Sequence, residues 1–200
     1  NEIWICSKMK LYTESENEKF LEIFEMDKEN KNENIFYMIE NQKIMKLMLN
    51  RIKKIKSISL KKNKKISSIY TSGILKNVEF KNNVSKYNLV IISVGYENAL
   101  IKNFFNHKVI KNSYREFAIS TIIEHSAVNN IIARQIFLDN SIFAILPISK
   151  TKTSIVWSLK NSMKNNSDYF FKEKIKKYAS NYVKNLKFVS SLEKKDLNLM

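Results

Sequence analysis

A stretch of alternating residues between Tyr114 and Leu159 constrains the fold of this chain more than any other feature. Every second residue from Phe117 to Ile123 is hydrophobic or threonine, which is the side-chain period of a strand with one buried face. A mostly apolar run, Ile142–Ile148, and a further strand-like run, Thr153–Leu159, follow with a short polar turn between them. The pattern predicts antiparallel strands joined by short connections.

Composition limits the loops that this chain can build. Its 200 residues include two glycines and one proline, so phosphate-binding glycine loops and turns that require positive φ are nearly excluded. A hydrophobic content of 44% is ample for a packed core, and the length suits one domain or pieces of two. The single cysteine, Cys6, excludes an internal disulfide and suits a reducing cytoplasm. No apolar run approaches the ~20 residues of a membrane span.

The net charge of +16 raises the question of a nucleic-acid partner. Of the 35 basic residues only Arg51, Arg115 and Arg134 are arginine, the residue best suited to planar recognition of bases and phosphates. Charge alone is a weak signal, so we favour a solvated, lysine-rich surface over nucleic-acid binding. We expect a cytoplasmic protein, and the lysines leave open a peripheral contact with the inner membrane.

The first part of the sequence predicts strands and one helix. Residues 3–11 and 20–25 are expected to form a hairpin, and residues 26–34 a polar linker. A core-packed amphipathic helix should then begin with Asn41 as its N-cap. Its apolar residues at helical spacing are Ile44, Met45, Met48, Leu49, Ile52 and Ile55. The free amides at its start, together with Gln42, would suit an anionic or polar ligand.

A lysine-rich segment, Lys53–Lys65, follows this helix with seven lysines and no acid. We interpret it as a solvated strand edge that carries Ile58 and Leu60 on one face, since lysines protect edges from mispairing. Ile66–Tyr70 and Val78–Phe80 extend it into a β-meander.

A nearly continuous apolar run, Leu89–Val94, predicts a strand buried on both faces. It ends at Gly95, before a predicted turn into a helix, and α/β folds bind ligands at such junctions. His107 and His125 have no cysteine, histidine or carboxylate partner at metal-ligand spacing, so we expect surface or hydrogen-bonded roles for both. No nucleophile triad or metal motif is found.

The last organised segment predicts a second amphipathic helix. Ser167 or Asp168 is a suitable N-cap. One stripe of this helix carries Phe171, Ile175, Tyr178, Tyr182 and Leu186.

Four blocks of the sequence, in this order, resemble a known family. They are YMIENQKIMKLML, NLVIISVGYENALIK, YREFA followed by EHSAVNNIIARQIFLDNSIFAILPI, and SIVWSL. The chain resembles the middle of the FAD-dependent aromatic hydroxylases of ubiquinone biosynthesis, within the p-hydroxybenzoate hydroxylase superfamily. The last two blocks are the specific ones.

The resemblance implies a mixed α+β and α/β fold. Residues 33–103 would be part of a FAD-binding domain, residues 1–32 and 104–187 a β-sheet substrate domain, and residues 188–200 a truncated tail. The family's opening G-x-G-x-x-G and later G-D motifs are absent, as expected for a central fragment. With FAD reduced by NAD(P)H, and with oxygen, the family hydroxylates the ring of a polyprenylated phenol. Other ubiquinone-biosynthesis proteins would be partners.

The resemblance also assigns site residues. Those that would contact FAD are Asn41, Gln42, Val94 and Gly95. Those that would lie near the flavin and the substrate are Phe137, Leu146 and Pro147, although core packing is an equally good interpretation of all three. No catalytic acid, catalytic base or metal ligand is assigned.

The chain departs from the family pattern at several of these positions. Gln42 replaces an arginine, Val94 stands where an acid belongs, Asn98 replaces a serine, and Ser141–Ile142 replaces a Gly-Pro pair. Two other interpretations therefore stay open. One is a non-catalytic relative that acts as a scaffold in a ubiquinone-synthesis complex. The other, which rests on charge alone, is a basic nucleic-acid-binding module.

Overall fold

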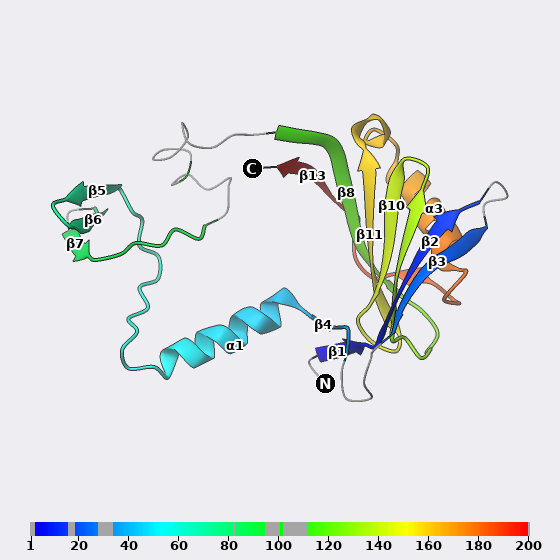
Figure 1. Cartoon of the computed structure of the whole chain (residues 1–200), viewed down its shortest axis with the longest axis horizontal. Coiled ribbons are helices and arrows are strands. Elements are labelled where there is room, and N and C mark those ends of the chain that lie inside the picture. Colours follow the sequence, from blue (N-terminus) through cyan, green and yellow to red (C-terminus); the bar gives the residue numbers. More distant parts are fainter. Residues whose placement is uncertain are drawn as a thin grey trace. The chain divides into compact units, whose positions relative to one another are not determined.

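The computed structural model describes residues 3–15, 19–27, 34–81, 83–94, 101 and 112–199. They form two compact units, whose elements are labelled in Figure 1. Unit 1 consists of residues 1–46 and 113–198, and unit 2 of residues 47–112 with the last two residues. The resemblance places the corresponding boundaries at residues 33 and 103. The division at residue 46 falls inside helix α1 (Asn41–Lys53).

Within the described residues, an eight-stranded sheet forms the framework of unit 1. Its order is β12-β8-β11-β10-β9-β2-β3, and β13 also pairs with β8. Strand β2 runs parallel to β9, whereas β8, β11, β10 and β9 are successive antiparallel neighbours (Figure 1), which confirms the predicted antiparallel sheet. The strands are β2 (Lys8–Glu14), β3 (Phe20–Asp27), β8 (Asn112–Glu124), β9 (Ile132–Leu138), β10 (Ser141–Pro147), β11 (Lys152–Lys160), β12 (Lys187–Phe188) and β13 (Glu193–Leu199).

Helix α3 (Asp168–Ala179), orange in Figure 1, covers one face of this sheet. The helix begins as predicted, because the Ser167 hydroxyl accepts a hydrogen bond from the Phe170 amide at 3.2 Å. The face of the sheet that it covers carries the alternate residues of each strand, as the period of two requires. Its buried residues include Phe117, Ile119, Ile123, Phe143, Ile145, Ile155, Trp157 and Leu159.

Four aromatic rings join α3 to the sheet. The indole of Trp157 lies 5.7 Å from Phe143, 6.0 Å from Phe171 and 5.7 Å from Tyr178, measured between ring centroids. Phe143 also lies 5.3 Å from Tyr178. All four contacts are edge-to-face, the geometry that the charge distribution of aromatic rings favours. These rings form the centre of the core of unit 1.

The first predicted strand, residues 3–11, is in fact two strands. β1 (Ile3–Cys6) pairs with β4 (Phe36–Ile39) in a separate two-stranded sheet, and β2 joins the large sheet. The chain changes partner at Ser7, whose amide donates to the Ile131 carbonyl at 3.0 Å. A continuous polar and apolar pattern does not reveal such a change of partner.

The predicted hairpin between β2 and β3 is confirmed, with a bulge between Leu11 and Tyr12. Strand β3 continues to Asp27, so residues 26 and 27 are strand rather than linker. Residues 28–33 of the predicted linker lie outside the described residues.

Helix α1 is confirmed, but its predicted core packing is wrong in the described structure. None of its residues is buried, and Met45, Leu47 and Met48 are 52%, 52% and 57% exposed. An amphipathic helix needs a surface to pack on, and no described residues bury this one. Neither α1 nor any other helix in the described ranges has the length and hydrophobicity needed to cross a membrane.

Unit 2 contains a meander of three strands. Two of them overlap the predicted strands Ile66–Tyr70 and Val78–Phe80, and the third has no counterpart in the prediction. β5 (Ser68–Ser72), β6 (Leu75–Phe80) and β7 (Asn83–Tyr87) form a three-stranded antiparallel sheet. Gly73 has φ of 61° in the turn between β5 and β6, a backbone conformation that costs glycine little.

Two predicted strands of unit 2 are not formed. The segment around Ile58 and Leu60 has no strand structure, and these two side chains are 46% and 44% exposed. The run Leu89–Val94 also has none, and Leu89 and Ile91 are 72% and 80% exposed. A strand buried on both faces needs neighbours on both sides, and no described segment pairs with either run.

The predicted tail after residue 187 adds to the sheet, because β12 and β13 both pair with β8. Strand β8 bends near its start (Figure 1). Arg115 has φ of 55° there, and the pairing of β8 with β11 begins at the next residue, Glu116.

The aromatic cluster predicts a large cost for removing one ring. Phe143→Ala should lower the free energy of unfolding by about 3–5 kcal/mol, because it leaves a cavity against Trp157 and Tyr178. Urea unfolding followed by tryptophan fluorescence measures this cost. Tyr169→Ala, on the exposed side of α3, is the control and should change the free energy by less than about 0.5 kcal/mol. Equal losses in the two variants would contradict this account of the core.

Candidate functional site

The face of the large sheet opposite α3 is the candidate site. Across β8, β11, β10, β9 and β2, the register aligns two rows of side chains on this face. The first row is Ala118, Ser158, Ile142, Phe137 and Thr13, and the second is Ser120, Val156, Ala144, Gln135 and Leu11. We call these ten residues the open face.

The open face is uncharged and formed largely of small side chains. Alanine or serine occupies both positions on β8 and one position each on β11 and β10, so the surface is shallow there. The members of the open face are half-buried apart from Ile142 at 40% exposure. Charged residues appear only beyond the two rows, where Glu116 faces Lys160 in the register. A neutral surface with a few hydroxyl and amide groups suits a flat, mostly apolar molecule whose polar atoms need hydrogen bonds.

The structure separates the three residues that the resemblance assigns to the substrate. Phe137 lies on the open face, opposite Ile142. Leu146 shares that face by alternation with Ala144 and is half-buried. Pro147 is buried on the side of the sheet that faces α3, opposite Thr153. The substrate roles of Phe137 and Leu146 stay predictions, and the placement of Pro147 is that of a packing residue.

Two of the predicted flavin contacts lie at the start of α1. The N-cap is Glu40 rather than Asn41, because the Glu40 carbonyl accepts from the amides of Lys43 at 2.9 Å and Ile44 at 3.2 Å. Asn41 and Gln42 are both exposed helical residues. Their amides precede the hydrogen-bonded turns and so suit a polar group of a cofactor.

The other predicted flavin contacts belong to unit 2. The side chain of Val94 is 40% exposed and offers no hydrogen bond, so only its backbone fits a polar group of FAD. Gly95 lies outside the described residues, as do Asn98 and His107. The role of Gly95 stays a prediction.

His125 is buried in a hydrogen-bonded network, so of the two expected roles it has the hydrogen-bonded one and not the surface one. Its Nδ1 lies 2.9 Å from the Ser126 carbonyl, which can only accept, so Nδ1 carries the proton. In the neutral ring Nε2 accepts from the Thr153 hydroxyl at 2.9 Å, and that hydroxyl accepts from Asn130 Nδ2 at 2.9 Å. Trp4 Nε1 donates to the Asn130 carbonyl at 2.6 Å and so ties β1 to this network.

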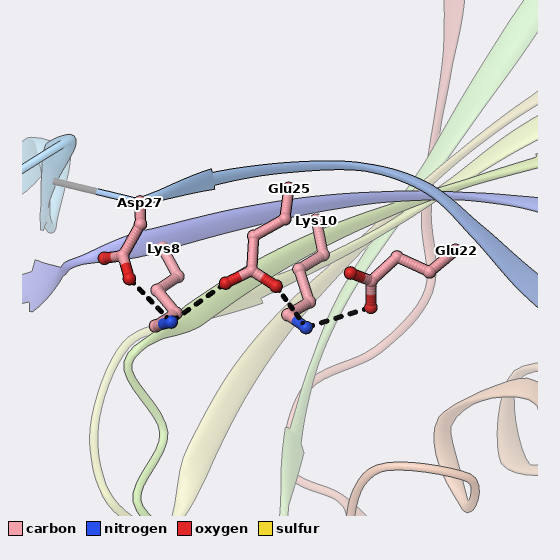
Figure 2. A network of polar contacts seen from close by, with 5 residues as sticks. All are labelled: Lys8, Lys10, Glu22, Glu25 and Asp27. Atoms are coloured by element: carbon pink, nitrogen blue, oxygen red, sulfur yellow. Dashed lines mark hydrogen bonds and ion pairs between the residues drawn. The ribbon is translucent and has the colours of Figure 1, made fainter.

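Charged side chains gather on the other face of strand β2 and of its neighbour β3, the edge strand, as Figure 2 shows. Lys8 lies 2.9 Å from Glu25 and 2.7 Å from Asp27, while Lys10 lies 2.6 Å from Glu25 and 2.9 Å from Glu22. Hydrogen bonds from Lys10 and then Lys8 lower the pKa of Glu25 from 4.5 to about 2. Tyr12 lies on the same face and packs against Tyr182, on the side of α3. The ion pairs are therefore kept away from the open face.

Only a weak pattern in the sequence indicates the open face. Alternation predicts the strands from their hydrophobic positions, and small residues such as Ala144 and Ser158 lie between those positions. Their spacing would have indicated a second, shallow face. What the sequence could not supply was the register that aligns them across five strands.

Several solved flavoproteins have a fold similar to that of this chain. No family model matches the sequence, and no curated protein matches it. The fold resembles that of the halogenase PltM, solved in complex with phloroglucinol and FAD, with a TM-score of 0.70 and 12% identity over 97% of this chain and 44% of that one. It also resembles CmlS, a flavin-dependent halogenase, with a TM-score of 0.68 and 10% identity over 98% of this chain and 38% of that one.

A flavoprotein/dehydrogenase from Cytophaga hutchinsonii has a similar fold. Its TM-score is 0.67, with 11% identity over 98% of this chain and 50% of that one. The chain thus spans half or less of the length of these structures. At such low identity the likeness concerns the fold alone, and the predicted mixed α+β fold of the flavoprotein hydroxylase type is confirmed.

The buried network predicts a specific cost for removing one hydroxyl. Thr153→Val should destabilise unit 1 by about 1–3 kcal/mol, because His125 and Asn130 each lose a buried partner. Thr153→Ser keeps the hydroxyl and is the matched control. Chemical unfolding of the two variants compares them. A valine variant as stable as the serine variant would show that the network contributes little.

The ion pairs of Figure 2 predict how Glu25 titrates. Because its pKa is lowered, its stabilising effect is present above pH 4.5 and is lost as the pH falls toward about 2. Lys10→Gln should raise the pKa of Glu25 toward 4.5 by more than Lys8→Gln does, since the Lys10 contact is the stronger influence. A carboxyl-carbon NMR titration measures both values. An unchanged midpoint in Lys10→Gln would refute the pairing.

Proposed function

We propose that this chain is part of a FAD-dependent oxidoreductase that acts on an aromatic compound, and that the open face binds this compound. The fold likeness to flavin-dependent enzymes over nearly the whole chain carries the proposal. The uncharged rows of small residues on the open face support it, because they suit one side of a flat ring.

FAD would supply the redox chemistry, and the residues of this chain would bind and orient the cofactor and the aromatic compound. By the family resemblance, Asn41 and Gln42 at the start of α1 would contact the cofactor, and so would Val94 and Gly95. The open face would exclude water from the ring, with Gln135 and Ser158 as hydrogen-bonding groups. No side chain on the open face has the acidity or basicity of a catalytic proton donor or acceptor, so positioning is the chain's contribution.

We further propose that the reaction is hydroxylation of a polyprenylated phenol in ubiquinone biosynthesis. In this reaction one atom of molecular oxygen would convert a ring C–H to C–OH, and the second oxygen atom would leave as water. A hydride from NAD(P)H and one proton would complete the balance. The sequence blocks of the hydroxylase family support this choice of substrate. The other enzymes of that pathway would be partners, and the lysine-rich surface would favour contact with an anionic membrane.

A non-catalytic scaffold within a ubiquinone-synthesis complex is the second candidate function. The apolar Val94, at a position where the family has an acid, favours it. Such a relative would keep the sheet and its partners but would not retain flavin.

Flavin retention and product analysis test the proposal. The protein produced from its full gene should copurify with FAD, oxidise NAD(P)H when a prenylated phenol is added, and yield a product with one added oxygen atom. Ala144→Trp should fill the open face and raise KM for the phenol about tenfold or more, while FAD is retained.

Tyr169→Trp, on the exposed side of α3, is the matched control and should leave KM unchanged. Equal kinetics in Ala144→Trp and the unchanged protein would remove the open face as the substrate site. A protein without flavin that still binds its pathway partners would establish the scaffold instead. A halogenated product that forms only with chloride or bromide would show that the reaction is halogenation and not hydroxylation.

A further inference from the structure

Unit 2 contains a lysine-lined pocket that the proposed function does not use. Its volume is about 410 Å³, within the range of small-molecule sites. One wall comes from the segment after α1, and the other from β6, β7 and the turn between them. The lining residues are Lys61, Asn63, Lys64, Lys65, Phe80, Lys81, Asn83 and Ser85.

The charge around this pocket is not balanced within unit 2. Between residues 47 and 94 the sequence has eleven lysines and arginines and one carboxylate, Glu79. Glu79 accepts a hydrogen bond from the Ser68 hydroxyl at 2.6 Å and follows the strand alternation away from Phe80, so it does not line the pocket. The four lining lysines form no ion pair within the described ranges, unlike Lys8 and Lys10 of unit 1.

Backbone conformation and one aromatic ring position polar side chains at the pocket. The Lys61 ammonium lies 5.7 Å from the centroid of the Phe80 ring, which helps to hold it at the wall. Asn63 and Lys81 both have φ of 54°, a conformation that is common for asparagine but costs a lysine about 1 kcal/mol. A two-residue hairpin turn requires positive φ, and lysine is not the residue that such turns prefer.

We propose that this pocket binds a diphosphate group, such as that of a nucleotide. Four ammonium groups supply the charge, and Asn63, Asn83 and Ser85 supply hydrogen bonds to phosphate oxygens. Its size suits a small molecule, whereas a nucleic acid would need an extended groove with stacking surfaces. The ligand neutralises a concentration of like charges that otherwise opposes folding of unit 2.

Isothermal titration of the 200-residue chain with inorganic pyrophosphate at 0.15 M salt tests the proposal. Lys64→Gln should weaken binding about tenfold, as expected for loss of one charge-assisted contact. Lys62→Gln removes the same charge two residues away, outside the pocket lining, and should change binding less than about twofold. Equal effects of these two variants would overturn the proposal, because they would indicate diffuse attraction to a basic surface.

A second variant separates binding from folding. Lys81→Asn removes a lining lysine and places a residue that tolerates positive φ, so it should weaken pyrophosphate binding without lowering the melting temperature. Lys86→Asn, on β7 outside the pocket lining, is its control. Unchanged binding in Lys81→Asn would refute the site.

Competition experiments with different ligands show which kind of molecule supplies the diphosphate group. ADP and FAD should compete with pyrophosphate, and adenosine should not. If single-stranded oligonucleotides bind more tightly with increasing length and pyrophosphate does not bind, the lysines form a nucleic-acid surface and not a diphosphate pocket. Because the assay contains no phenol and depends on unit 2 alone, its failure leaves the proposed function of the open face untouched.

Discussion

The contact between Trp157 and the rings around it is the interaction on which unit 1 depends. It joins β11 to β10 through Phe143 and to α3 through Phe171 and Tyr178. Aromatic rings bury a large area and prefer defined angles, so this cluster fixes the helix on one face of the sheet. With that face filled, the opposite face is the one that remains available to a ligand.

The two faces of the sheet differ because the strands alternate. Along β10, Phe143 and Ile145 are buried toward α3, whereas Ala144 lies on the open face between them. Along β2 the face toward α3 also carries Lys8 and Lys10, whose carboxylate partners lie on β3. One side of the sheet therefore holds the core and the ion pairs. The other side keeps the neutral, shallow surface that we propose as a substrate site.

Unit 2 differs from unit 1 because few of its described apolar residues are buried. Leu89 and Ile91 are strongly exposed although their sequence is that of a buried strand. In a sheet such residues are covered by neighbouring strands and helices, and no described segment covers them here. The lysine-lined pocket is formed by residues of this unit alone.

The sequence by itself determined the elements whose partners lie nearby in the chain. Alternation predicted the strands of the large sheet from Phe117 onward. The stripe through Phe171 and Ile175 predicted α3 together with its cap. These patterns are local, and short connections leave few alternatives for pairing.

Tertiary structure decided everything that depends on a distant partner. The split of residues 3–11 at Ser7, the parallel pairing of β2 with β9, and the addition of β13 to β8 follow from long-range contacts that no local pattern encodes. The same holds for Leu89–Val94, because hydrophobicity shows that a run can be buried but not that anything covers it. The open face and the lysine-lined pocket also required the structure, because each brings together residues from separate strands and loops.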